Sequence, residues 1–173
     1  MLVYKPPVDD IAFLLETFGY EDILKYDGFA DFDMDVARAI LESAGDVCVS
    51  ELLPTNAAGD QTPLGFDPET GDVTVAPAFK KAYKALVEAG LIGLSHGAEY
   101  GGMGAPHMLA FMAGEFVTAT NKSLGMAPAL GHGLIASLTH YGSDEQKAMY
   151  LEKLITGEWT GTMCLTEPQC GTD

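Results

Sequence analysis

Hydrophobic periodicity is the feature that most constrains this 173-residue chain, because it changes once, close to the C-terminal end. Up to about residue 157, apolar residues recur every three or four positions, which is typical of amphipathic helices. From Trp159 to Leu165 the period becomes two, with Thr and Cys at the even positions. Because alternation is typical of a strand, we predict an all-α domain followed by the first strand of another structure.

Six helices are expected, and prolines, glycines and one capping box mark their ends. Ser143 and Gln146 form that capping box, at the start of the last helix. Pro54 should close the second helix, and Pro128 with several glycines should interrupt the fifth. A loop with one small hairpin around Gly71 should fill residues 55–75. The expected helices cover about residues 8–18, 34–53, 77–90, 107–120, 123–141 and 143–157. In the first of them, the predicted apolar face consists of Ile11, Leu14, Leu15 and Phe18.

Charge and cysteine content exclude several classes of function. The net charge of −16, from 25 acidic and 9 basic residues, repels nucleic acid and anionic lipid, so we expect neither a nucleic-acid nor a membrane partner. The three cysteines lack metal-type spacing, which fits reduced thiols and a cytoplasmic location. The four histidines are scattered, and their spacing predicts no metal site.

Three motifs occur in the order in which one enzyme family has them. Residues 166–168 (T-E-P) and 171–173 (G-T-D) resemble the T-E-P-x-x-G-S-D signature of acyl-CoA dehydrogenases. Residues 99–104 resemble the E-Y-G-G-x-G loop of that family, and residues 142–151 resemble its G-x-x-x-Q-K…Y-L helix. Residues 3–10 and 157–163 are similar to the branch that includes 3-methylmercaptopropionyl-CoA dehydrogenase. The resemblance covers essentially the whole chain.

This resemblance implies a fold and an activity. Residues 1–157 would form the N-terminal helical domain of an acyl-CoA dehydrogenase-like fold, and residues 158–173 the start of a truncated middle β-domain. The implied activity is FAD-dependent α,β-dehydrogenation of an acyl-CoA thioester, with 3-methylmercaptopropionyl-CoA as a candidate substrate. The catalytic base of the family belongs to a C-terminal domain, so no catalytic residue is assigned here and the fragment is expected to be inactive alone. Further implied partners are an electron-transfer flavoprotein and other copies of the full-length protein.

The resemblance also implies site residues. The Thr166 hydroxyl and N–H would bind the flavin ring, in a cofactor-binding set of Met163, Leu165, Thr166, Gly171 and Thr172. The substrate-binding set is Met126, Ala129, Leu130, Gly133 and Thr172. The small residues of residues 121–133 fit close helix packing equally well.

Two tempting assignments are rejected, the first on the spacing of the residues and the second on what the resemblance implies. Gly101, Gly102 and Gly104 match neither a P-loop nor a dinucleotide fingerprint, so tight loop packing is the better interpretation. Glu167 is interpreted as part of a structural turn rather than as a general base.

Two other classes of function stay open at this point. An acyl-CoA oxidase shares the fold and the flavin but passes electrons to oxygen. A standalone helical domain could instead use its apolar faces to bind a protein partner.

Overall fold

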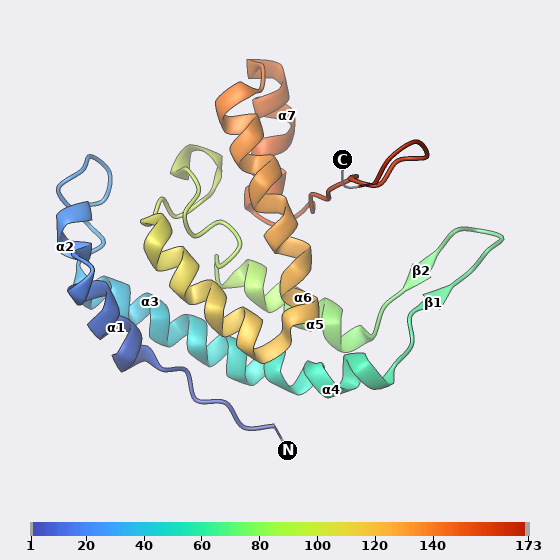
Figure 1. Ribbon diagram of the computed structural model, residues 1–173, viewed down its shortest axis with the longest axis horizontal. Coiled ribbons are helices and arrows are strands. Elements are labelled where there is room, and N and C mark those ends of the chain that lie inside the picture. The colour runs from blue at the N-terminus through green and yellow to red at the C-terminus, as the bar shows by residue number, and fades with distance from the viewer. Residues whose placement is uncertain (1, 172–173) are drawn as a thin grey trace.

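The computed structural model describes residues 2–171 and is predominantly helical (Figure 1). Its elements lie in the following order: α1 (Val8–Thr17), α2 (Tyr20–Ile23), α3 (Met34–Val47), the π-helical turn η1 (Cys48–Leu52), α4 (Leu53–Gln61), β1 (Gly65–Phe66), β2 (Val73–Thr74), α5 (Pro77–Glu88), the 3₁₀ turn η2 (Ala98–Tyr100), α6 (His107–Tyr141) and α7 (Asp144–Ile155). The predicted all-α class is confirmed. Within residues 2–171, no helix combines the length and the apolar character needed to cross a membrane.

The segment from α3 to α4 is longer than its sequence predicts. Pro54 was expected to end a helix, but the helical path continues to Gln61. The wide turn η1 separates α3 from α4, so Pro54 falls in the first turn of a new helix. A first-turn residue needs no N–H donor within the helix, and proline is tolerated there.

α6 joins the two helices that were expected at 107–120 and 123–141. Its break lies at Asn121, whose φ of −154° and ψ of 92° are not helical. The expected interruption at Pro128 is wrong, because the helix continues through that residue. In Figure 1 the two halves of α6, yellow and orange, form a V whose vertex lies beside α3 and α4.

The core lies where α1, α3, η1, α5 and the first half of α6 meet. Large apolar side chains fill it, among them Leu15, Leu41, Leu52, Leu86 and Phe116. A smaller cluster joins the second half of α6 to α7 and consists of Ile135, Leu151, Leu154 and Ile155.

The predicted apolar face of α1 is only half buried. Ile11 and Leu15 are in the core, whereas Leu14 and Phe18 are exposed at 37% and 66%. The sequence shows which residues of a helix are apolar, but the width of the buried stripe depends on how many elements cover it. Here Tyr20, from the short helix α2 that the sequence did not predict, is buried in the core close to α1.

The hairpin expected around Gly71 is confirmed, and the strand expected from Trp159 to Leu165 is not. β1 and β2 pair antiparallel, with Phe66 opposite Val73, and Gly71 adopts a φ of 76°. Residues 160–167 form no strand, because no neighbouring strand accepts or donates their backbone hydrogen bonds within residues 2–171. The alternating sequence pattern therefore marked a non-helical segment that pairs with no other strand within residues 2–171.

Candidate functional site

A cavity of about 510 Å³ opens inside the V of α6. Both halves of α6 contribute walls, and a third wall comes from the end of α5 and the loop that follows it. Most of the lining is apolar, with Ser95, His107, Glu115, Thr118 and His132 as its polar residues. Such a cavity suits a ligand with an apolar body and few polar groups.

The vertex of the V is held by a buried polar joint. Asn121 is 2% exposed, and its Nδ2 donates to the Thr55 hydroxyl over 2.8 Å. Its Oδ1 accepts the Leu124 N–H over 3.0 Å, which caps the second half of the helix. Asn56 of α4 donates from Nδ2 to the Thr120 carbonyl over 3.0 Å. Because these bonds tie the break in α6 to α4, they fix the angle between the cavity walls.

The loop between α5 and α6 folds back on itself, and its glycines allow this. The Gly104 N–H donates to the His96 carbonyl over 2.9 Å, and the Met103 N–H donates to the Gly93 carbonyl over 3.1 Å. A Cβ on Gly102 would lie 2.1 Å from the His96 carbonyl oxygen. Gly101 has a φ of 84°. The tight packing that was predicted for this glycine motif is what the structure shows.

Three histidines gather at one edge of the cavity, although the sequence showed them as scattered. His96 Nε2 and His132 Nδ1 are 2.9 Å apart, and the two rings lie 5.1 Å centroid to centroid. His107 Nδ1 lies 3.3 Å from the Ser95 hydroxyl. Within residues 2–171, no group of three or more metal-ligand side chains could hold a metal ion. Spacing along the chain could not reveal this cluster, because a loop and both halves of a bent helix bring it together.

The small residues of α6 serve two purposes in different places. Ala129 lines the cavity, whereas Gly131 lies at the contact with Gly161, whose own Cβ position is 3.2 Å from the Gly131 Cα. Met126, Leu130 and Gly133 are exposed and do not line the cavity. Some predicted substrate-binding residues therefore line the cavity and others do not. Contact of these residues with an acyl group stays a prediction.

The C-terminal segment extends away from the helices (Figure 1). Near its start, Gly161 is buried against Leu134. Beyond it, the segment is exposed, with Met163 at 62% and Leu165 at 51%. The Glu167 N–H donates to the Cys170 carbonyl over 2.8 Å and closes a turn. The Glu167 carboxylate accepts a hydrogen bond from the Gln169 side chain.

This turn presents the residues predicted to bind a cofactor. Thr166, directly before it, is exposed, as is Gly171 at its end. Thr172, predicted for both cofactor and substrate, lies outside the described residues. An uncharged hydroxyl and N–H beside two apolar side chains form a donor set that suits the polar edge and apolar faces of a flavin ring.

Comparison with known proteins identifies the family. Residues 35–158 match the acyl-CoA dehydrogenase N-terminal domain family. The chain is 41% identical over 173 residues to 3-methylmercaptopropionyl-CoA dehydrogenase of Ruegeria pomeroyi, covering 99% of this chain and 29% of that protein. It is 33% identical to the broad-specificity linear acyl-CoA dehydrogenase FadE5 of Mycobacterium tuberculosis, covering 98% of this chain and 28% of that protein.

Solved structures have the same fold. A chain in the structure of the electron-transferring flavoprotein of Acidaminococcus fermentans, solved towards a mechanism of flavin-based electron bifurcation, matches with a TM-score of 0.61 at 26% identity. That match covers 79% of this chain and 33% of the other. Butyryl-CoA dehydrogenase of Megasphaera elsdenii matches with a TM-score of 0.60 at 23% identity, covering 80% and 34%.

The chain belongs to the acyl-CoA dehydrogenase family, as a member of its N-terminal domain family. It spans about three tenths of the length of the curated relatives that it matches.

Proposed function

We propose that this chain is the N-terminal helical part of an FAD-dependent acyl-CoA dehydrogenase that removes hydrogen from the α and β carbons of an acyl-CoA thioester. The observation that carries the proposal is the 41% identity along 99% of the chain to 3-methylmercaptopropionyl-CoA dehydrogenase. That relative makes 3-methylmercaptopropionyl-CoA the first substrate to test. The mostly apolar cavity between the halves of α6 supports a substrate with an apolar acyl group.

We propose that residues 1–157 form one domain and that residues 158–173 begin the next. Gly161 packs against Leu134 and anchors the junction between them. The exposed segment beyond it would gain cover from the rest of the enzyme, since isolated extended chain leaves its backbone groups unpaired.

Bound FAD would supply the site that accepts hydride from the β carbon. The role of this chain is to hold and orient. Thr166 would donate hydrogen bonds from its hydroxyl and N–H to the ring edge, and Met163 and Leu165 would give apolar contact. Gly171 and Thr172 complete the proposed cofactor set. The proton of the α carbon would pass to a base outside these 173 residues, so this chain alone would be inactive.

Further assignments follow from the same proposal. Ala129 would border the acyl group inside the cavity. Met126, Leu130 and Gly133, which do not line the cavity, are proposed with Thr172 to contact the substrate outside it. An electron-transfer flavoprotein is the proposed acceptor of electrons, and the full-length protein is proposed to be a cytoplasmic homo-oligomer.

The test uses the full-length protein. It should purify with a visible flavin spectrum and should bleach that spectrum anaerobically on addition of 3-methylmercaptopropionyl-CoA or a short linear acyl-CoA. Thr166→Ala should weaken flavin retention, whereas Thr162→Ala, four residues earlier in the same exposed segment, should not. A purified full-length protein that is colourless and binds no added FAD would contradict the proposal.

A further inference from the structure

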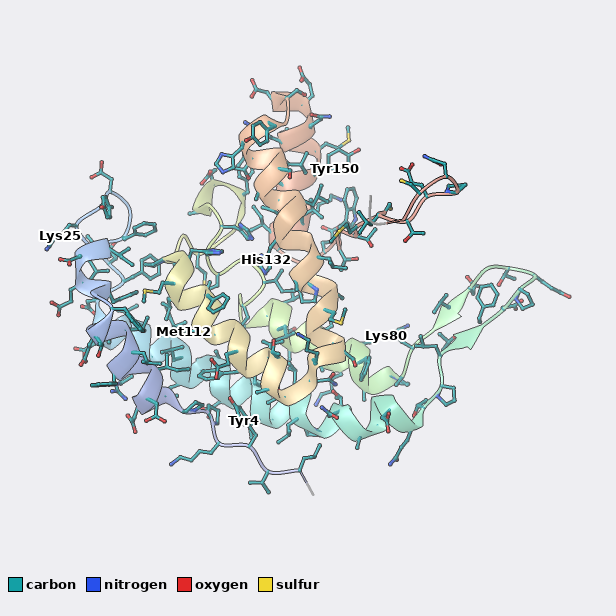
Figure 2. All side chains as sticks on the ribbon, in the orientation of Figure 1. Tyr4, Lys25, Lys80, Met112, His132 and Tyr150 are labelled. Carbon is teal, nitrogen blue, oxygen red and sulfur yellow. The ribbon has the colours of Figure 1, made fainter. Side chains whose placement is uncertain are left out.

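The contact between His96 and His132 joins two walls of the cavity. His96 lies on the loop that follows α5, and His132 lies on the second half of α6. In Figure 2, His132 lies between the olive loop and the orange half of α6. The ring nitrogens are 2.9 Å apart, which is hydrogen-bonding distance.

The backbone of His96 is fixed independently of its side chain. Its carbonyl accepts the Gly104 N–H, and its own N–H donates to the Gly93 carbonyl over 3.1 Å. Gly102 lies so close that a Cβ there would be 2.1 Å from the same carbonyl oxygen. Within residues 2–171, side chains of the loop form two hydrogen bonds to α6. One joins Ser95 to His107 at the start of the helix, and the other joins His96 to His132 on its second half.

We propose that His96 and His132 form a latch that holds this loop against the second half of α6 and opens when both imidazoles are protonated. One nitrogen must donate and the other accept, so the neutral pair forms the bond. When the pair gains one proton, one of the two facing nitrogens is still unprotonated and can accept the bond. With two added protons, both facing nitrogens carry hydrogen and both rings are cations.

The surroundings keep the pair neutral. Burial, followed by the charges of His132 and His107, lowers the pKa of His96 from 6.5 to about 4. Burial, followed by the charge of His107, also lowers the pKa of His132. Both shifts favour the neutral form. Because the first proton leaves the bond in place, the latch stays closed until the pH approaches about 4, the pKa of His96, and is lost as the pH falls through that value.

The elements that surround the pair carry other polar and charged groups. Ser95, Glu99 and Tyr100 come from the loop, and Glu115 lines the cavity from the first half of α6. The Glu99 carboxylate lies against Gly97. From α7, uncharged Thr156 reaches the loop at Gly101. In the part of the chain that the structure describes, neither ring forms an ion pair with a carboxylate.

Hydrogen exchange of the full-length protein tests the latch without an activity assay. After correction for intrinsic rates, the amides of Met103, Gly104 and Ala105 should keep constant protection from pH 8 to about 6. As the pH falls through about 4, the pKa of His96, they should begin to exchange roughly five to ten times faster, the change expected for one hydrogen bond. Amides of α3 report whether the whole domain remains folded.

Variants separate the latch from general acid sensitivity. His132→Gln keeps a hydrogen-bonding side chain that does not titrate, so the loop should stay protected at every pH. His132→Ala should give the fast exchange already at pH 7. His140→Ala, on an exposed position two turns along the same helix, should behave like the parent protein. An unchanged loop in His132→Ala, or the same acid step in His132→Gln, would overturn the proposal.

Discussion

Asn121 shows how a single side chain sets the shape of the cavity. It occupies the non-helical position in α6, donates to Thr55 and caps Leu124. Removing it takes away the bond that the buried Thr55 hydroxyl accepts, although that hydroxyl still donates to the Leu52 carbonyl, and it leaves the Leu124 N–H without its cap. Each loss costs about 1 kcal/mol.

We therefore expect Asn121→Ala to lower the free energy of unfolding by about 2 kcal/mol. Asn56→Ala removes one bond at the same joint, to the Thr120 carbonyl, from a more exposed position. It should cost about 1 kcal/mol. Urea denaturation measures both values. Equal losses in the two variants would contradict a special role for Asn121.

Gly102 is the glycine of the E-Y-G-G-x-G motif with the least space around it. Its Cβ position lies 2.1 Å from the oxygen and 2.5 Å from the carbon of the His96 carbonyl, and backbone cannot move aside as a flexible side chain can. Gly133, by contrast, is a helical glycine with nothing within 4 Å of its Cβ position.

Gly102→Ala should therefore destabilise the domain by about 2–3 kcal/mol. Gly133→Ala should stabilise it by up to about 1 kcal/mol, because alanine favours helix more than glycine does. Thermal denaturation of the two variants beside the parent protein gives the comparison. A neutral Gly102→Ala would show that the loop has room that the structure does not assign to it.

At the scale of elements, local signals predicted helices well and helix connections poorly. Pro77 and the Ser143 capping box mark real helix starts because their effects act within one turn. Pro54 was wrongly predicted to end a helix, because the π-helical turn before it places this proline in the first turn of the next helix. The same limit applies to the site: motifs located the glycine loop and the Thr166 turn, whereas the His96–His132 contact depends on the bend at Asn121.

The capping box of α7 offers an element-scale prediction. Ser143 accepts the Gln146 N–H, and the Gln146 side chain accepts the Ser143 N–H. Ser143→Ala should destabilise the domain by about 1 kcal/mol, with faster hydrogen exchange confined to the first turn of α7.

Ser137 provides the matched control for that substitution. It is exposed on α6 about one turn before the helix ends at Tyr141, where alanine is the better helix former, so Ser137→Ala should be neutral or slightly stabilising. Equal destabilisation by the two changes would mean that the box contributes nothing beyond the loss of a serine.

At the scale of the molecule, charge is the dominant property. The net charge is −16, and each ion pair formed within the described residues has at least one exposed partner. Exposed ion pairs contribute little to stability, so the many carboxylates of the surface repel one another.

Salt should therefore stabilise this protein. Raising the ionic strength from about 0.01 M to 0.15 M shortens the screening length from about 30 Å to about 8 Å. We expect Tm to rise by roughly 2–4 °C, which corresponds to about 1 kcal/mol for a domain of this size. Scanning calorimetry in sodium chloride and in potassium chloride should give the same shift, because screening depends on ionic strength. A constant or falling Tm would contradict self-repulsion.

The bend in α6 also turns a small rotation into a large displacement at the far end of the helix. The 20 residues from 122 to 141 extend about 30 Å from the vertex at 1.5 Å per residue, and α7 packs near their far end. A rotation of about 5° at the vertex would therefore move that end by roughly 2–3 Å. Substitutions at Asn121 or Thr55 should be felt most strongly not beside them but at α7 and at the start of the segment that carries Thr166.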